Sequence, residues 1–120
     1  SWILDEWKHP KTDRPWGWYR VLDDKPGYKV KELVIYPGKS LSYQRHNKRA
    51  EHWYVLKGKC ILKTKHKNIE NIQEISENRY YDVGKKIWHQ GSNNQTTSCH
   101  ILEVQHGKKC VEEDIERLDV

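Results

Sequence analysis

The chain has 120 residues, enough for one hydrophobic core and too few for two, so we expect a single domain over 1–120. Only 35% of the residues are hydrophobic, but six Trp and seven Tyr offer large buried areas, which predicts a thin, aromatic-rich core. The net charge of +5 would suit binding to nucleic acid or to a membrane surface. However, acidic residues are interspersed nearly everywhere, and the densest basic stretch, 57–67, alternates like a strand with one solvated face. We therefore expect neither partner.

The cysteines and the lack of a long apolar segment indicate the compartment. Cys60, Cys99 and Cys110 form no metal-type pair, and their odd number argues against a complete disulfide framework, so we interpret them as small buried hydrophobic residues. No stretch is apolar for long enough to cross a bilayer, and the first residues do not resemble a signal peptide. These features predict a cytoplasmic protein.

The first segment, 1–18, is rich in Trp, Pro and charged residues. Pro10 and Pro15 cannot donate a backbone N–H, and we expect them to block regular strand ladders. The sequence therefore predicts an ordered N-terminal arm that packs its tryptophans against the rest of the domain.

Four later stretches show the alternation and the β-branched or aromatic content of strands. They are 28–36, 52–56, 60–64 and 100–104. Turn residues separate the strands at Pro26-Gly27, Pro37-Gly38, Gly58, Gly84 and Gly91. Many short strands spaced by turns predict an all-β sandwich or barrel.

Two segments have two interpretations each. In 67–78, Ile69, Ile72 and Ile75 recur every three residues, which suggests a weak helical stripe, but a hairpin with a long polar loop is equally compatible. The tail, 111–120, is either a short helix or a closing strand.

A possible metal half-site lies between a Pro-Gly turn and an aromatic strand. Gln44 and His46 are two residues apart and project to one face of an extended segment, and the four residues before Glu51 allow its carboxylate to rejoin them. A fourth ligand must come from far away, and His89, which follows Gly84, is the best candidate. Such side chains close together also often form an ordinary solvated surface.

These residues also resemble the cupin family. Its first motif resembles 38–58, where Gln44, His46 and Glu51 stand at the ligand positions, with Gln in place of the first His. Its second motif resembles 84–89, although Gly84 and Lys86 replace the usual Pro and Gly. The resemblance implies a double-stranded β-helix, or jelly-roll barrel, with an N-terminal arm and a short C-terminal segment.

More narrowly, six collinear stretches resemble type II phosphomannose isomerase. They are Arg14-Pro15-Trp16-Gly17, Tyr28-Lys29-Val30-Lys31, Gln44-Arg45-His46, Arg49-Ala50-Glu51-His52-Trp53, Glu103-Val104-Gln105 and Glu113-Asp114-Ile115-Glu116-Arg117. This resemblance implies a divalent metal, with zinc as the usual expectation, and interconversion of mannose 6-phosphate and fructose 6-phosphate. Two departures are Lys48, where the family commonly has another His, and 65–81, which has little family character.

Aldose–ketose isomerisation passes through an enediolate, whose charge a metal acting as Lewis acid would stabilise. A base of tuned pKa must also move the proton, and the sequence does not identify it securely. We take Lys31 and Arg49 as catalytic candidates, and Lys29 and Arg117 as candidates for substrate binding. Solvated lysines and surface salt bridges are the alternatives for these four.

The neighbours of the predicted ligands are expected to have supporting roles. His52 follows Glu51 on a strand, so it should point to the opposite face as a structural residue. Trp53 and Trp88 should fill the core rather than stack on a sugar. Glu103 and Gln105 are candidates for orienting the ligands.

The sequence therefore predicts a metal-dependent sugar-phosphate isomerase whose partner is a small-molecule sugar phosphate. One alternative is a non-catalytic sugar-binding cupin, and another is a metal-dependent cupin enzyme of a different class, such as an oxygenase. The family resemblance also implies a possible homodimer.

Overall fold

The computed structural model describes residues 8–118, and its eleven named elements are all β-strands. The larger sheet has the order β1-β2-β3-β10-β5-β8 and consists of β1 (Thr12–Arg14), β2 (Gly17–Lys25), β3 (Tyr28–Ile35), β10 (Cys99–Gly107), β5 (Arg49–Lys57) and β8 (Tyr80–Val83). The smaller sheet has the order β11-β4-β9-β6-β7 and consists of β11 (Glu116–Leu118), β4 (Tyr43–Arg45), β9 (Trp88–Ser92), β6 (Lys59–His66) and β7 (Ile69–Ser76). The predicted all-β jelly-roll fold is confirmed.

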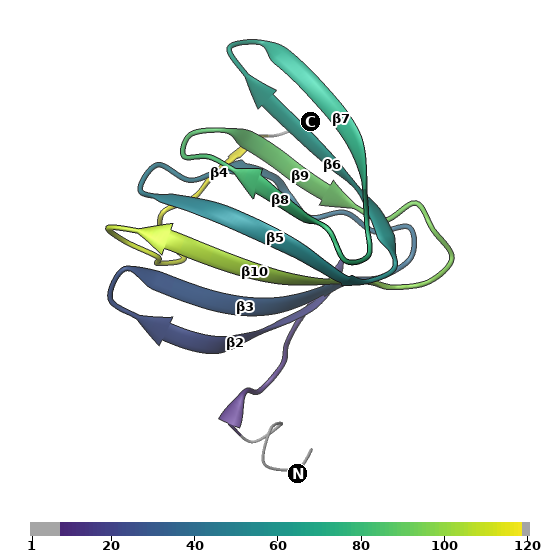
Figure 1. Cartoon of the computed structure of the whole chain (residues 1–120), viewed down its shortest axis with the longest axis horizontal. Coiled ribbons are helices and arrows are strands. Elements are labelled where there is room, and N and C mark those ends of the chain that lie inside the picture. Colours follow the sequence, from purple (N-terminus) through teal and green to yellow (C-terminus); the bar gives the residue numbers. More distant parts are fainter. Residues whose placement is uncertain (1–7, 119–120) are drawn as a thin grey trace.

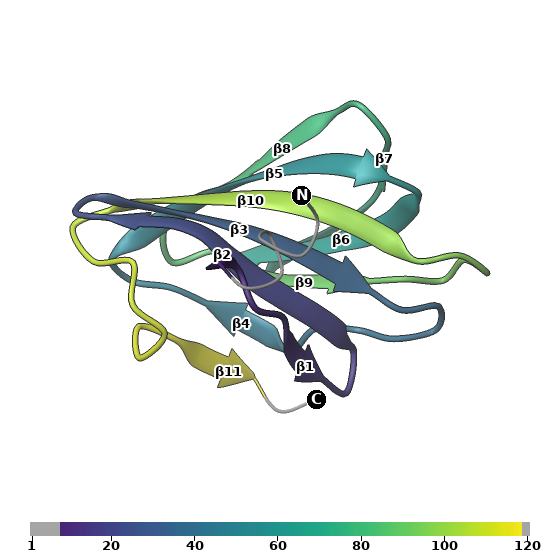
Figure 2. The same ribbon diagram turned by 90° about the horizontal axis from the view of Figure 1, so that it is seen from below.

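The two sheets lie face to face and enclose the interior of the barrel. Figure 1 shows β2, β3, β10 and β5 as one curved layer, with the β6–β7 hairpin projecting at one end. In the second view β10 and β3 lie above β4 and β9 (Figure 2). Across residues 8–118 no helix is long and apolar enough to cross a membrane.

Strand alternation divides the interior into an apolar end and a charged end. In β10 the inward residues Cys99 and Ile101 are followed on the same face by Glu103 and Gln105. The antiparallel neighbours repeat this order across the sheet. Their inward residues are Ile35, Leu33, Lys31 and Lys29 in β3, and Val55, Trp53, Glu51 and Arg49 in β5.

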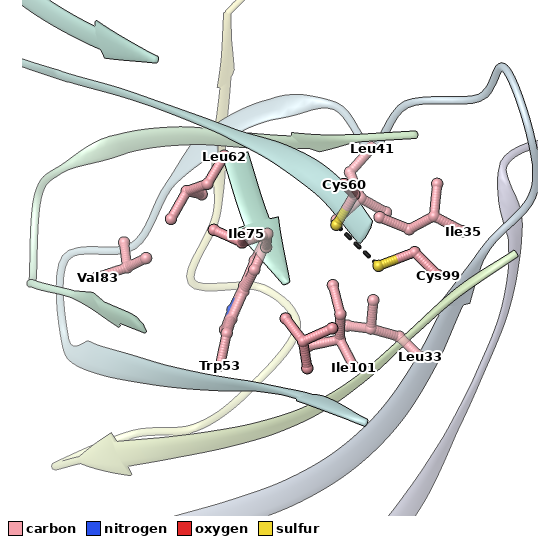
Figure 3. Close-up of a cluster of buried hydrophobic side chains, with 11 residues drawn as sticks. Leu33, Ile35, Leu41, Trp53, Cys60, Leu62, Ile75, Val83, Cys99 and Ile101 are labelled. Carbon is pink, nitrogen blue, oxygen red and sulfur yellow. Dashed lines mark hydrogen bonds between the residues drawn. The ribbon is translucent and has the colours of Figure 1, made fainter. Parts of the chain in front are cut away.

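The apolar end holds the hydrophobic core, which both sheets supply (Figure 3). Its buried members are Leu33, Ile35, Leu41, Trp53, Val55, Cys60, Leu62, Ile75, Val83, Cys99 and Ile101. Cys60 in β6 and Cys99 in β10 bring their Sγ atoms to 2.9 Å, one from each sheet. Cys110 is buried as well, so the expectation that the three cysteines act as buried residues is confirmed.

The segment 67–78 is a hairpin strand, and the helical alternative is wrong. Lys67 and Asn68 form a two-residue turn with positive φ values of 51° and 64°, the geometry that suits the twist of a tight hairpin. The polar loop is therefore much shorter than expected. Only Ile75 is buried, whereas Ile69 and Ile72 are 74% and 59% exposed on an edge strand, which explains why their spacing was misleading.

Both ends of the described chain add strands to the sheets. The tail forms β11, which pairs with β4, so the closing-strand alternative is correct. The expectation that prolines block ladders in the arm is wrong for Thr12–Arg14, because Pro15 lies in the turn that joins β1 to β2. Trp16 packs against the core, while Trp2 and Trp7 lie outside the described residues. Gly91 lies within β9 instead of a turn, and its Cα faces the ring of Trp53.

Candidate metal centre

Three buried side chains converge between the sheets, where the apolar end meets the charged end. His46 follows β4, Glu51 lies in β5 and His89 lies in β9, and one ligand atom from each falls within 4.8 Å of the others. His46 Nε2 lies 3.0 Å from Glu51 Oε2, and His89 Nε2 lies 3.5 Å from Glu51 Oε1. The three residues are 3%, 2% and 1% exposed, in that order, so their polar atoms depend on one another for partners.

Backbone carbonyls fix the orientation of both imidazoles. His46 Nδ1 lies 2.7 Å from the carbonyl oxygen of Asp114, and His89 Nδ1 lies 3.0 Å from that of Ile87. A carbonyl only accepts a hydrogen bond, so each Nδ1 carries a proton and each Nε2 faces Glu51. Metal-binding histidines commonly have this arrangement.

Two imidazole Nε2 atoms that face one carboxylate can share it with protons or with a metal ion. The guanidinium Nη2 of Arg49 lies 3.2 Å from His46 Nε2. His89 Nε2 is buried and has no hydrogen-bond partner among the described residues. An orphaned imidazole nitrogen of this kind carries a desolvation cost that a metal ligand bond would remove. The donor set of two imidazoles and one carboxylate therefore fits a divalent metal ion.

Glu51 is held in place on both oxygens. Trp53 Nε1 donates to Oε1 at 3.1 Å, and Arg49 Nε donates to Oε2 at 3.2 Å. Burial alone would raise the pKa of Glu51, but in the metal-free chain its contact with His46 Nε2 and the charge of the His46 and His89 rings when they are protonated outweigh burial and hold the pKa well below its usual value. The carboxylate is therefore ionised and preorganised at neutral pH.

A cavity of about 230 Å³ opens beside these residues. Its lining includes six of the eight site residues predicted from the sequence: Lys31, Gln44, His46, Arg49, Glu51 and Arg117. Gln44 pairs with His89 in the β4–β9 ladder, which places both on neighbouring strands. His89 lies behind the cavity wall, and its role and that of Gln44 as ligands stay predictions.

The predicted basic residues have different surroundings. Arg49 is buried and is tied to the backbone oxygen of Val111 at 3.1 Å as well as to Glu51, so it supports a ligand instead of standing free for a substrate. Lys31 forms an ion pair with Glu112 on the cavity wall. Lys29 is buried outside the lining, with its Nζ 3.8 Å from Glu112.

Two other groups near the site were not assigned from the sequence. Arg14, in β1, lines the cavity, whereas the sequence indicated only that it belongs to a family-like stretch. Asp114 accepts hydrogen bonds from the backbone N–H groups of Asn47 and Lys48, at 3.1 and 2.9 Å, and so fixes the loop after His46. No sequence pattern links Asp114 to a position 68 residues away from it.

Glu103 was expected to orient a ligand, but its hydrogen-bond partner is Gln105, whose Nε2 donates at 2.5 Å. It lies on the cavity wall, 6% exposed. Burial, followed by the charge of Glu51, raises the pKa of Glu103 to about 7. Trp53, which was expected only to fill the core, orients Glu51 together with Arg49.

The remaining neighbours follow the strand alternation. His52 lies on the outer face, with its Nε2 2.8 Å from His106 Nε2, and Trp53 is 1% exposed in the core, as expected for both. The core position expected for Trp88 is wrong. Because His89 points inward, Trp88 faces outward, where it packs edge-on against Tyr43 with ring centroids 6.2 Å apart.

The fold and the buried His-Glu-His cluster define a cupin-type barrel. Among solved structures, the capsular polysaccharide assembling protein CapF of Staphylococcus aureus superposes with a TM-score of 0.80 at 19% identity, over 93% of this chain and 34% of that one. Oxalate decarboxylase of Bacillus subtilis gives a TM-score of 0.80 at 15% identity, over 92% of this chain and 30% of that one. At these identities the likeness concerns the fold alone.

The chain belongs to the family described as mannose-6-phosphate isomerase C-terminal, which matches residues 5–120. It is 36% identical over 113 residues to a mannose-1-phosphate guanylyltransferase of Salmonella muenchen, covering 93% of this chain and 23% of that protein. It is 35% identical over 111 residues to the alginate biosynthesis protein AlgA of Pseudomonas putida, covering 92% of this chain and 22% of that protein. The chain thus spans less than a quarter of these relatives.

Proposed function

We propose that this chain is a metal-dependent sugar-phosphate isomerase that interconverts mannose 6-phosphate and fructose 6-phosphate. The observation that carries the proposal is the buried cluster of His46, Glu51 and His89, with an orphaned Nε2 on His89, beside a cavity lined by basic side chains. Membership of the mannose-6-phosphate isomerase C-terminal family supports the substrate class.

Gln44, His46, Glu51 and His89 would hold the metal, for which we propose zinc. One carboxylate and three neutral ligands leave a dication with a net positive charge. Bound there, the metal would polarise the substrate carbonyl and stabilise the enediolate oxygens. Trp53 and Arg49 hold Glu51 before the metal arrives, which lowers the cost of organising the site.

The phosphate group would bind at the mouth of the cavity. Arg14 belongs to β1 and Arg117 to β11, the outermost strands of the two sheets, and both are exposed while they line the cavity. Guanidinium groups bind phosphate through paired hydrogen bonds, and an exposed mouth leaves the dianion partly hydrated. Lys31 would contact the sugar further inside, near the charged end of the interior.

The experiment combines elemental analysis of the purified protein with a coupled assay for fructose 6-phosphate made from mannose 6-phosphate. We expect one zinc per chain and measurable turnover, both lost in His46→Ala and His89→Ala. His106→Ala, on the outer face, is the matched control and should keep both properties. A wild-type protein without metal would refute the metal site, and metal without turnover would favour a sugar-binding cupin or an enzyme of another class.

A further inference from the structure

The charged end of the interior has a regular layout on the larger sheet. The registers of β3, β10 and β5 place Lys31, Glu103 and Trp53 in one row, and Lys29, Gln105 and Glu51 in the next. Glu103 is therefore a diagonal neighbour of Glu51 on the adjacent strand, a relation that separates residues by about 7–8 Å. At that spacing a substrate atom can lie between the metal ligands and the Glu103 carboxyl.

Three carboxylates line the cavity, and two of them are already engaged. Glu51 belongs to the metal cluster. Glu112 is ion-paired with Lys31 and Lys29, and although burial would raise its pKa, these lysines and Arg49 hold it below the usual value, which makes it a weak base. Glu103 is the cavity carboxyl that has no ion pair within the described residues.

Glu103 also carries a burial cost that the fold does not require. Ile101 occupies the preceding inward position of β10 and fills it with hydrocarbon, whereas a buried carboxyl at Glu103 loses hydration that its ionised form needs. Its Oε1 accepts a hydrogen bond from Gln105, while Oε2 makes none within the described residues. One oxygen of a poorly solvated carboxyl on the cavity wall is therefore without a protein partner there.

We propose that Glu103 is the catalytic base that carries the proton between C2 and C1 of the sugar; this inference rests on the isomerase function proposed above. The Glu103 carboxylate removes the proton from C2 of the open-chain aldose, which leaves an enediolate across C1 and C2. The same carboxyl returns the proton to C1, while the proton of the C2 hydroxyl passes to O1. No proton is gained or lost overall, and Glu103 ends as it began.

The burial of Glu103 suits this role, because a carboxyl with a pKa near neutrality is both a stronger base and ready to give the proton back. Lys31 is a poorer candidate for the same step. Its Nζ is held in an ion pair with Glu112 and lies 4.6 Å from the centroid of the Tyr19 ring, so two partners already engage this amine.

The test compares Glu103→Gln with wild type in deuterated water, after both proteins have been loaded with zinc. Glu32→Gln is the matched control, because Glu32 lies on β3 and forms an ion pair with Arg20 on the opposite face of the same sheet. For Glu103→Gln we expect unchanged zinc content, at most a few-fold change in KM, and a fall in kcat of about a hundredfold or more. Deuterium should appear at C1 of the wild-type product to the extent that the Glu103 carboxyl exchanges its proton with solvent before it returns a proton, and Glu32→Gln should match wild type.

The outcomes separate this inference from the isomerase function. Wild type without turnover refutes both. Turnover in wild type together with kcat within threefold in a metal-loaded Glu103→Gln protein refutes the role of Glu103 alone. If Glu103→Gln formed product at an undiminished rate with deuterium at C1 to the wild-type extent, another base would carry the proton, which would likewise overturn the role of Glu103 and leave the isomerase intact.

Discussion

The buried carboxyl of Glu103 should make the metal-free protein less stable as the pH rises. Its pKa is about 7 in the folded chain against 4.5 for a solvated Glu, so the folded state holds this proton more tightly than the unfolded state does. The resulting stabilisation is complete below pH 4.5 and is lost as the pH rises to about 7. A shift of this size corresponds to about 3 kcal/mol in the free energy of unfolding.

Replacement of Glu103 by Gln removes this ionisation and keeps the shape of the side chain. Relative to wild type, Glu103→Gln should gain about 3 kcal/mol in the free energy of unfolding between pH 5 and pH 8. Urea unfolding followed by tryptophan fluorescence measures the difference, with EDTA present because a bound dication would itself stabilise the carboxylate. Glu32→Gln is again the control, and its difference from wild type should not change over this range.

The measurement reports a difference between two proteins, so the titration of groups common to both largely cancels. The groups that act on Glu103 are Glu51, which raises its pKa, and Lys31, Gln105 and Arg49, which lower it. If the wild-type and Glu103→Gln stabilities ran parallel from pH 5 to pH 8, the carboxyl would not be desolvated as the structure indicates.

Three further predictions concern other parts of the site and the core. Trp53→Phe keeps most of the packing but removes the N–H donated to Glu51, so the zinc dissociation constant should rise about tenfold in a competition titration; an unchanged constant would contradict this orienting role. Arg14→Ala should raise KM for mannose 6-phosphate about tenfold with little effect on zinc content, and equal KM values would remove Arg14 from the phosphate site. Mild oxidation by a small-molecule disulfide should join Cys60 to Cys99, with two thiols lost per chain by thiol titration and a higher Tm; persistence of both thiols after unfolding and refolding in the oxidant would contradict it.

The strands that could be predicted from the sequence are those whose side chains alternate between apolar and polar. β3, β5, β6 and β10 have this pattern and were identified, although β5 and β10 extend further than expected. β9 was missed because its inward residues, His89 and Gly91, do not form an apolar face. His89 belongs to the candidate metal cluster, and Gly91 leaves room for the ring of Trp53. β7 was ambiguous because an exposed edge strand needs no apolar alternation.

The candidate metal cluster of His46, Glu51 and His89 was predictable because family motifs preserve the spacing of these residues, but the rest of the site depends on strand register. Glu103 meets the cavity only because β10 pairs with β5 in the observed register, and a slip of one residue would turn it to the outer face. Asp114 reaches the ligand loop across the closing segment, a contact that no local pattern encodes. The residues of the candidate metal cluster could therefore be predicted from the sequence. The residues that hold them in place are brought together by pairing between distant strands, which the sequence does not reveal.

The division of the interior separates the residues that maintain the fold from those that contact a ligand. Substitution of Glu103 replaces a group whose desolvation opposes folding, so it is expected to leave the chain folded while it alters the chemistry of the cavity. This makes the charged end a region where new substrate preferences could evolve without loss of the scaffold. Trp53 is the exception, since its ring belongs to the core and its N–H holds Glu51, and evolution at this single position is constrained by stability and activity together.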